Sequence, residues 1–499
     1  MFGLTATNIF LYFLFPIAVV SISIYLVRSR EVNFSSYFFA NRNVSWFFLG
    51  ISFLIPSITG PYLISLSSGK FTVEYLLLYF CSSVFMLLVY EKFFSRIITG
   101  NDIHTLPEYF EKKYNRSMRF FVSGLYIFFN LVIRLMMVLV FGSILINLIT
   151  GIDISSSLLF FLIISGIYVI IGGLHADIYG NSIQLFFIVL GVVGFLIWVL
   201  QKSEDGFFNF NGISQITGVS GGHSQFAWYE LIFGVPVLAF WFWFADHLII
   251  QKSLSTNNGA RLKKATYFAI LMQIVPLLIF SLFLLVINSS QSSSFESSIT
   301  SFLKINELPE SLKLILIIAV SAVLIASIAN IFNGTTALVT LDFYRTIKPQ
   351  TSERKLILVG RFTTIILLLI SIPMIPLVKE MNFNSGIMLF RIFTYFASMI
   401  TALLIVSVLS KKSNSTGAII TLSISTIIVL FRVIGEIFPS RNGFWSAFTG
   451  WYMNSGFLEF SIFVFIVSAL SLTFFNRLKP VSSGLSSGKE IKEKLINIK

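Results

Sequence analysis

The sequence predicts an all-α membrane protein that crosses a lipid bilayer many times. Hydrophobic residues make up 56% of the 499-residue chain and charged residues only 11%, whereas soluble globular proteins carry roughly 25% charged residues. Too little polar surface remains to dissolve a packed core of this size. The apolar residues also fall into long runs, and a spanning helix needs about 20 of them. We therefore expect a multi-pass protein of the cell membrane.

About 13 apolar segments are long enough to span the bilayer. Two of them, 118–149 and 312–343, exceed its thickness, so we expect them to tilt or to project beyond it. In chain order the segments cover residues 5–27, 46–66, 72–94, 118–149, 154–173, 178–200, 229–250, 264–288, 312–343, 355–378, 386–410, 415–435 and 453–475.

The basic residues predict the orientation of the chain. With the N-terminus outside, most of the 35 lysines and arginines lie in the odd-numbered loops and in a cytoplasmic C-terminal tail, as the positive-inside rule requires. The net charge of +13 therefore indicates membrane topology, and we expect no nucleic-acid partner. The single cysteine, Cys81, excludes an intrachain disulfide framework and a Cys-based metal site.

The second segment contains helix-breaking residues at membrane depth. Pro56, Gly60 and Pro61 lie near its middle, and each proline removes a backbone donor and clashes with the preceding turn. Unwound helices of this kind bind ions and substrates in transporters, where a cavity or the protein satisfies the freed carbonyls. A simple proline kink, which is common in membrane helices, is the alternative interpretation.

Arg134 lies in the middle of the fourth segment, among apolar residues. Burying an arginine there costs about 2.5–3.5 kcal/mol on insertion scales. Its guanidinium cannot release its proton, and its planar fork matches a carboxylate. We predict that Arg134 binds a substrate. The alternatives are an internal ion pair, for which no carboxylate is nearby in sequence, and a snorkelling side chain.

The other charged residues of the spans have simpler interpretations. We expect Arg391 at the membrane interface and Asp342 in a structural pair. Asp246 and His247, near the inner end of the seventh segment, are predicted to be gate or interface groups. No nucleophile–base pair or metal-binding cluster is apparent, because the histidines do not cluster, so an enzyme is the class that we expect least. Three histidines are placed in loops, namely His104, His175 and His223.

Several stretches resemble the sodium:solute symporter family, in order and at the family's spacing, over roughly residues 35–415. Gly172–Ala176 with Asn181–Gln184 is similar to the family's Gly-Gly-Leu…Asp-x-Ile-Gln stretch. Ile249–Leu254 is similar to Val-Gln-Arg-x-Leu. The remaining matches are Tyr37–Trp46 with Gly50–Ser52, Leu106–Tyr114, and Asn333–Thr336 with Thr340–Arg345.

The resemblance implies a LeuT-type core of two inverted five-helix repeats, which rock around a midplane site to give alternating access. It implies a secondary active transporter of a small-molecule substrate, and we expect the monomer to be the functional unit. The expected parts are an extra N-terminal helix at 1–30, the first repeat at 45–200, the second at 229–410, C-terminal helices at 415–475 and a cytoplasmic tail at 476–499.

The resemblance also implies a main sodium site, which is incomplete in this chain. The family's carbonyl ligands map to Ile55, Ile58 and Val323, and its pair of hydroxyl ligands maps to Ala326 and Ser327, so one hydroxyl is missing.

A second sodium site, present in some members of the family, needs two serines and an aspartate. These positions are occupied by Ala329, Asn330 and Asn181 in this chain. We therefore expect at most one sodium ion, weakly bound. A sodium-independent or proton-driven carrier, or a non-transporting sensor on the same fold, remains an alternative.

The implied substrate pocket differs from that of the sugar carriers. The positions of their sugar-binding polar groups are occupied here by side chains that cannot make the same hydrogen bonds to a sugar. A sugar hydroxyl that is buried without a hydrogen bond weakens binding. Arg134 falls where bacterial sialic acid symporters carry a carboxylate-binding arginine. We thus predict sodium-coupled symport of a small carboxylate-bearing solute, with a neutral sugar or polyol as the alternative. Besides Arg134 the predicted pocket residues are Ser57, Thr59, Tyr62, Cys81, Phe390 and the aromatic gate residues Phe80 and Trp243.

Overall fold

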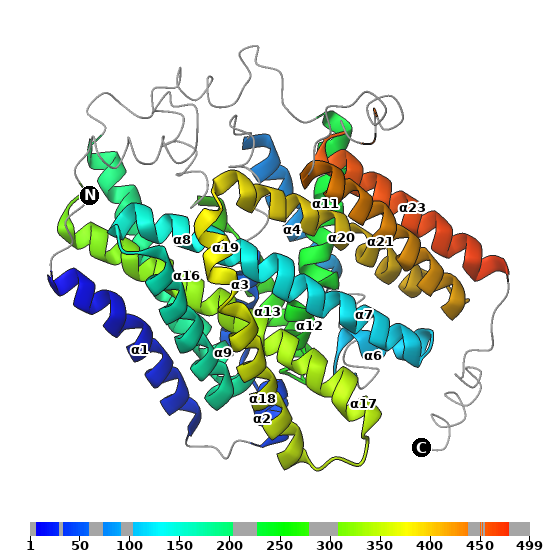
Figure 1. The fold of residues 1–499 in the computed structure, drawn as a ribbon, viewed down its shortest axis with the longest axis horizontal. Coiled ribbons are helices and arrows are strands. Elements are labelled where there is room, and N and C mark those ends of the chain that lie inside the picture. Colours follow the sequence, from blue (N-terminus) through cyan, green and yellow to red (C-terminus); the bar gives the residue numbers. More distant parts are fainter. Residues whose placement is uncertain are drawn as a thin grey trace.

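The computed structural model describes residues 6–28, 33–58, 73–90, 103–202, 227–278, 308–437, 450, 452 and 455–478. Regular structure in these residues is helical throughout (Figure 1), which confirms the predicted all-α fold class. Eight described stretches are long and apolar enough to cross a membrane, and a bent helix pair gives up to a ninth. The remaining predicted spans rest partly on residues outside the described ranges.

Most of the described helices overlap predicted segments, whereas the short helices at 34–39 and 106–113 lie between them. The first half of the chain contains α1 (Ala6–Arg28), α2 (Phe34–Phe39), η1 (Ala40–Arg42), α3 (Trp46–Ile58), α4 (Val73–Val89), α6 (Leu106–Lys113), α7 (Arg116–Phe128), η4 (Phe129–Leu135), α8 (Met136–Thr150) and α9 (Ile154–Lys202). The second half contains η5 (Glu230–Gly234), α11 (Val235–Phe240), η6 (Trp241–Ala245), α12 (His247–Ser253), α13 (Gly259–Met272), α16 (Glu310–Ala337), η7 (Leu338–Tyr344), α17 (Arg345–Ile347), α18 (Glu353–Ser371), α19 (Met374–Glu380), α20 (Phe383–Leu409), α21 (Ser415–Ile437) and α23 (Phe457–Leu478).

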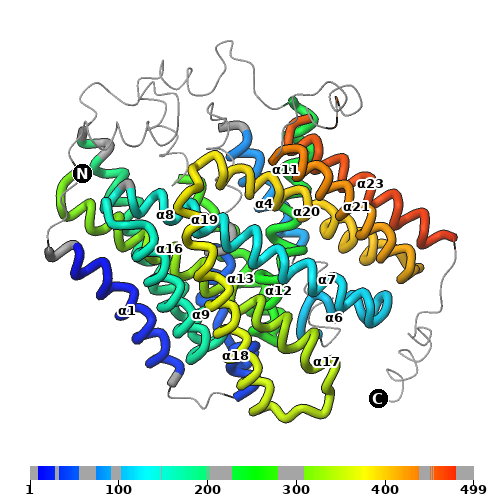
Figure 2. The backbone as a smooth tube through the Cα atoms, viewed as in Figure 1, coloured from blue at the N-terminus to red at the C-terminus, as the bar shows by residue number. Residues whose placement is uncertain are grey.

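Helices α9 and α16 form the most extensive helix pair of the described structure. Small residues allow them to approach closely, because a Cβ on Gly191 would lie only 2.6 Å from the Cβ of Ala319, and small residues at helix interfaces are typical of membrane proteins. Helix α1 packs on the outer side of this pair. Helices α21 and α23 pack beyond α20, on the opposite side of the molecule (Figure 2).

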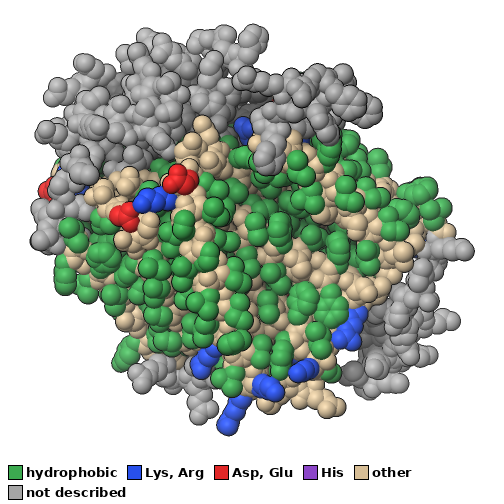
Figure 3. Space-filling model, viewed as in Figure 1, with side chains coloured by type: hydrophobic (Ala, Val, Ile, Leu, Met, Phe, Trp, Pro, Cys, Tyr) green, Lys and Arg blue, Asp and Glu red, His purple; other side chains and the backbone are tan. Residues whose placement is uncertain are grey.

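A belt of apolar side chains covers the outside of the molecule. Leu358, Phe362 and Leu369 on α18 are each about 60% exposed, at 61%, 63% and 60%. In Figure 3 hydrophobic side chains cover the middle of the visible face, and Lys and Arg gather at its lower edge. This distribution suits a protein whose middle faces lipid and whose ends face water.

Two predicted spans, 154–173 and 178–200, meet without a loop. They form α9, whose backbone turns sharply at Gly173, with φ 56° and ψ −153°. A side chain is excluded there, because a Cβ would lie 2.6 Å from the carbonyl oxygen of Tyr37. The prediction of a loop position for His175 is therefore wrong. His175 is buried on α9 directly after this turn, with Nδ1 3.1 Å from Ser36 Oγ.

The two segments predicted to exceed the bilayer thickness contain π-helical turns. Residues 116–150 form α7, η4 and α8 in succession, and η4 contains Arg134. The segment beginning at α16 continues through η7, which contains Asp342. Single π-helical turns inside α-helices occur frequently at functional sites. Both turns thus place a charged side chain in the protein interior.

Asp342 lies at the centre of a buried network, which confirms the structural pairing predicted for it. Its Oδ1 accepts hydrogen bonds from Arg119 Nε at 2.8 Å and Thr105 Oγ1 at 2.5 Å, and its Oδ2 accepts one from Ser123 Oγ at 3.0 Å. Arg119 also pairs with Glu111 at 2.6 Å. The network joins α7 to η7, which lie 223 residues apart in sequence.

Glu108 on α6 adds a further negative charge beside Arg119, at 3.8 Å. Burial acts to raise the pKa of the Glu108 carboxyl, but hydrogen bonds from His104 and the charges of His104 and Arg119 lower the pKa to about 2. The Glu108 carboxylate is therefore ionised throughout the physiological pH range. Its negative charge stabilises the positive charge of Arg119.

The Asp342 network yields a prediction about stability. Asp342→Ala removes the buried partner of Arg119, and breaking such a pair costs about 3–5 kcal/mol. The melting temperature of the purified protein in detergent should fall clearly. Asp153→Ala is the control, because Asp153 and Lys379 form an exposed pair at 3.5 Å and exposed pairs contribute little. Equal melting temperatures for both variants would contradict the assignment.

Candidate functional site

The helix that begins at Glu230 is broken at Asp246. The stretch Glu230–Ala245 and the helix His247–Ser253 are bent by 42° relative to each other. Asp246 adopts an extended conformation, with φ −71° and ψ 116°, and its side chain accepts a hydrogen bond from the Leu248 N–H at 3.0 Å. Aspartate is a preferred residue at the N-cap of a helix because it satisfies such a free donor. Asp246 therefore starts α12 inside the predicted seventh span.

The break leaves a backbone carbonyl that a side chain from another helix satisfies. The hydroxyl of Tyr126, on α7, donates a hydrogen bond to the carbonyl oxygen of Ala245. In a continuous helix this carbonyl would accept from the N–H four residues later. A discontinuous helix is tolerated at membrane depth only where protein or a cavity supplies such partners.

Arg134 pairs with Asp246 inside the protein. Its Nη1 donates to Oδ1 at 3.0 Å, and its Nη2 donates to Oδ2 at 2.5 Å. Only 5% of Arg134 and 1% of Asp246 is exposed. Two parallel hydrogen bonds between a guanidinium and a carboxylate form the strongest kind of ion-pair geometry. The internal ion pair left open from the sequence is thus present, and binding of a substrate by Arg134 stays a prediction.

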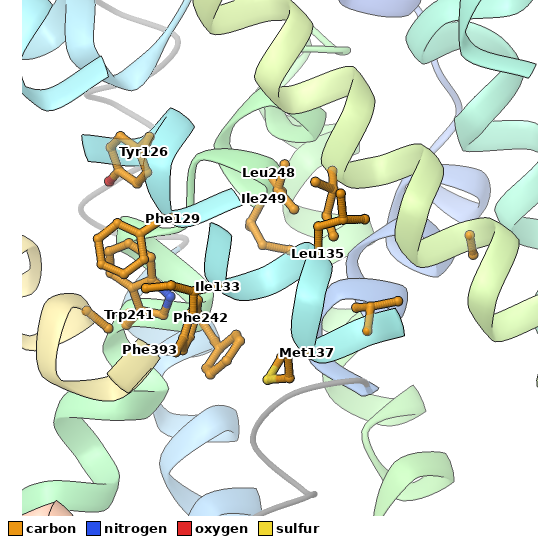
Figure 4. Close-up of a cluster of buried hydrophobic side chains, with 14 of the residues drawn as sticks. Tyr126, Phe129, Ile133, Leu135, Met137, Trp241, Phe242, Leu248, Ile249 and Phe393 are labelled. Carbon is orange, nitrogen blue, oxygen red and sulfur yellow. The ribbon is translucent and has the colours of Figure 1, made fainter. Parts of the chain in front are cut away.

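Aromatic rings lie next to this ion pair, and Figure 4 shows Phe129, Trp241 and Phe393 close together. The Arg134 guanidinium lies over the ring of Phe393, 5.3 Å from its centroid. Trp241 lies 5.8 Å from Tyr126, 6.0 Å from Phe129 and 5.8 Å from Phe393 between ring centroids. We call Tyr126, Phe129, Trp241 and Phe393 the aromatic cluster. These rings exclude water from the pair and strengthen its electrostatic attraction.

The sequence interpretation did not identify the aromatic cluster. Instead it named Trp243, which is buried two residues after Trp241, and Phe390, which lies 6.1 Å from Phe393 between ring centroids. The density of aromatic residues between Phe240 and Phe244 was the available signal. It could not show which ring faces Arg134, because π-helical turns shift the helical period.

The other predicted pocket residues are placed in part. Cys81 is exposed on α4, and Phe80 beside it is half-buried. Ser57 belongs to α3 by its backbone, but its side chain lies outside the described residues. Thr59 and Tyr62 lie outside them altogether.

The residues named for sodium fit an oxygen site only in part. The Ser327 hydroxyl is buried on α16, and it has no hydrogen-bond partner among the described residues. The carbonyl of Ala326 accepts the Asn330 side-chain amide at 2.7 Å. Val323 is half-buried on the same helix, and Ile55 and Ile58 lie on α3 with side chains outside the described set. A hard cation takes oxygen ligands, and Ser327 is free to supply one.

A membrane helix that is broken inside the protein, with polar groups at the break, is typical of one class of membrane protein. Discontinuous helices with polar groups near the midplane form the solute sites of secondary transporters. Residues 37–424 match the sodium:solute symporter family. The chain belongs to this family, whose members are transporters and not enzymes.

Known relatives and structures agree with this membership. The chain is 25% identical to a sodium/glucose cotransporter of Vibrio parahaemolyticus, over 86% of this chain and 85% of the relative. It is 24% identical to the mouse sodium/myo-inositol cotransporter 2, over 85% and 69%. A structure of a Na⁺-coupled sialic acid symporter shares its fold, with a TM-score of 0.77 at 15% identity, over 95% of this chain and 98% of the other.

The break at Asp246 yields a prediction. Tyr126→Phe removes the donor to the Ala245 carbonyl while it keeps the ring, and leaving a buried acceptor unsatisfied costs about 1–3 kcal/mol. The melting temperature should therefore fall. Tyr25→Phe, at a side chain that is 76% exposed on α1, is the matched control and should melt like the unaltered protein. A Tyr126→Phe variant that melts like this control would show that the hydrogen bond is dispensable.

Proposed function

We propose that this protein is a cation-driven symporter of a small organic solute, whose carboxylate binds Arg134 in exchange for Asp246. The bidentate pair between Arg134 and Asp246 carries the proposal. A solute carboxylate has the same two oxygens and the same charge as the aspartate side chain. It can therefore replace Asp246 at the guanidinium and keep Arg134 paired, while the displaced Asp246 carboxylate then needs a cation or a proton of its own.

This exchange would couple solute binding to a change of conformation. Asp246 holds the N-terminus of α12 as well as Arg134, so its release would free the joint between η6 and α12. Arg134 sits on a different helix and keeps its charge throughout. The aromatic cluster would close around the solute and keep water out. Rocking of one helix bundle against the other around such a site is the general mode of alternating access.

The driving cation follows from the family and from α16. The family is named for sodium coupling, and Ser327 offers a buried hydroxyl without a partner in the described structure. Ala326 cannot supply the second hydroxyl of the pair, and its carbonyl is engaged by Asn330. These features support one sodium site of low affinity, used as a transported ion.

A neutral sugar or polyol is the second candidate for the solute. The Arg134–Asp246 pair is already neutral as a unit, and hydroxyl groups could bond to both partners without displacing either. The glucose and myo-inositol cotransporters among the relatives favour this candidate. Aromatic faces such as that of Trp241 would also suit the apolar face of a sugar ring.

We also propose that the N-terminus faces outside and that the C-terminus is cytoplasmic. The linker between α17 and α18 and the adjoining helix ends carry Arg345, Lys348, Arg354 and Lys355, and the positive-inside rule assigns such an end to the cytoplasm. Lysines and arginines gather along this end of the molecule in Figure 3.

Uptake into proteoliposomes would decide between the two solutes. We expect Arg134→Ala to abolish uptake of sialic acid or another organic acid, because the anion loses its partner. Asp246→Asn should bind the acid more tightly, since the competing carboxylate is gone, and it should turn over more slowly. The measurements are uptake of labelled solute and its competition by organic acids, glucose and myo-inositol.

Arg391→Ala is the matched control for the loss of an arginine. Arg391 is exposed on α20, over the ring of Phe457, so the variant should retain uptake. Full uptake of the acid by Arg134→Ala would overturn the anion-binding role. If glucose or myo-inositol competes with uptake and organic acids do not, the site binds a neutral solute.

The sodium site has its own test. Ser327→Ala should lower the apparent sodium affinity of uptake, because it removes the remaining hydroxyl ligand. Ser321→Ala on the same helix is the control, since the buried Ser321 hydroxyl is satisfied by the Ile317 carbonyl at 2.7 Å. Unchanged sodium dependence in Ser327→Ala would remove Ser327 from the sodium site.

A further inference from the structure

Lys252 on α12 is a buried lysine that the proposed solute site does not use. Only 1% of its surface is exposed, and its Nζ donates a hydrogen bond to the carbonyl oxygen of Ser52 at 2.7 Å. Charged side chains inside membrane proteins are costly and mark ion pathways or proton relays. Lys252 lies one residue after Gln251, in the stretch that resembles the family's Val-Gln-Arg-x-Leu.

The carbonyl that Lys252 binds is one that a proline has freed. Ser52 lies four residues before Pro56 on α3. Proline has no N–H, so it cannot donate to the carbonyl four residues earlier, as other residues of a helix do. The Lys252 ammonium supplies the missing donor. It therefore ties α12, which follows the break at Asp246, to the turn of α3 that precedes Pro56.

Asp177 on α9 is a second buried charge. It acts on Lys252 electrostatically, without a hydrogen bond between the two side chains, and it is completely buried. Neither of its carboxylate oxygens makes a hydrogen bond within the described residues, although Asn181 lies against it one turn further along α9. A buried carboxylate without donors depends on a neighbouring positive charge for its ionised form.

The remaining charges around the pair are balanced among themselves. Arg134 and Asp246 also act on Lys252, but they neutralise each other through their two hydrogen bonds. Tyr168, whose hydroxyl donates to the Ala176 carbonyl at 2.6 Å, faces Asp177. His247 begins the same helix as Lys252, and neither ring nitrogen has a hydrogen-bond partner among the described residues. The charge of Lys252 is thus compensated chiefly by Asp177.

Lysine differs from the arginine of the similar family stretch in one property. Arginine holds its proton under all conditions in proteins, whereas a buried lysine can release it. At the same time the second sodium site is missing the aspartate and serines that it would need, because residues 181, 329 and 330 are Asn, Ala and Asn. The resemblance thus implies that the chain lacks a second sodium site, and Asp177 lies one turn along α9 from Asn181, which occupies one position of that site.

We propose that Lys252 and Asp177 form a proton-binding site that couples solute movement to protons, in place of a second sodium ion. With the proton on Lys252, the pair is neutral and α12 is held to α3. Release of the proton from the Lys252 Nζ to cytoplasmic water leaves a neutral amine and the Asp177 carboxylate, so the pair then carries a single negative charge. A proton entering from outside restores the ammonium, so one proton crosses in each cycle.

The test uses the whole protein in proteoliposomes with equal sodium on both sides. We expect a pH gradient, acidic outside, to drive accumulation of whichever labelled solute the vesicles transport among sialic acid, glucose and myo-inositol. Lys252→Arg keeps the charge but cannot release a proton. It should lose this accumulation, down to the level of protein-free vesicles, while it retains exchange of labelled for unlabelled solute.

Lys113→Arg is the matched control. Lys113 also donates to a backbone carbonyl, that of Ser410 at 2.6 Å, but it is half-buried at the C-terminal end of α6, and Asp177 and Asp246 are not among the groups that act on it. This variant should accumulate solute like the unaltered protein. Accumulation by Lys252→Arg equal to that of Lys113→Arg would overturn the proposal, and so would a failure of the pH gradient to drive uptake that a sodium gradient does drive.

A second measurement does not depend on any solute. Infrared difference spectra of the reconstituted protein, recorded between acidic and alkaline buffer, should contain a shift of a carboxylate band that Asp177→Asn removes, because Asp177 loses the neighbouring positive charge when Lys252 releases its proton. Identical spectra for the two proteins would refute proton release beside Asp177. The proposal rests on the proposed transport function, but if no solute is taken up under any gradient, the spectra still decide whether the pair exchanges a proton.

Discussion

A charge that lies inside an apolar, membrane-embedded core must be neutralised within the protein, because neither water nor lipid can do so. Three of the buried cationic side chains in the described structure meet this constraint in similar ways. Arg134 pairs with Asp246, Arg119 with Asp342, and Lys252 faces Asp177. Each of these pairs joins helices that are far apart in sequence, so the packing of the bundle depends on them.

The three pairs differ in whether their partners can be exchanged. Asp342 accepts three side-chain hydrogen bonds and is held in one arrangement. Asp246 holds both a guanidinium and a helix N-terminus, so a competing carboxylate would release two contacts together. Asp177 has no hydrogen bond in the described residues, and its partner is the only one of the three cations that can release a proton. A fixed pair suits a structural joint, and exchangeable pairs suit a transport cycle.

The backbone interruptions place these charges. The π-helical turn around Arg134, the break at Asp246 and the proline on α3 all free backbone groups or shift the helical period, and polar side chains then satisfy the freed groups. Tyr126 binds the Ala245 carbonyl, and Lys252 binds that of Ser52. The interruptions and the buried polar side chains therefore depend on each other.

Sequence alone determined the all-helical membrane fold, because the length of an apolar run and the helical period are local properties. It also determined membership of the symporter family and the structural pairing of Asp342. It could not give Arg134 its partner, since Asp246 lies 112 residues away and a break in the seventh span was not apparent from an apolar run. Only the tertiary structure brought Lys252 to Ser52, 200 residues away, because contacts of that separation depend on how the helices pack and not on any pattern within them.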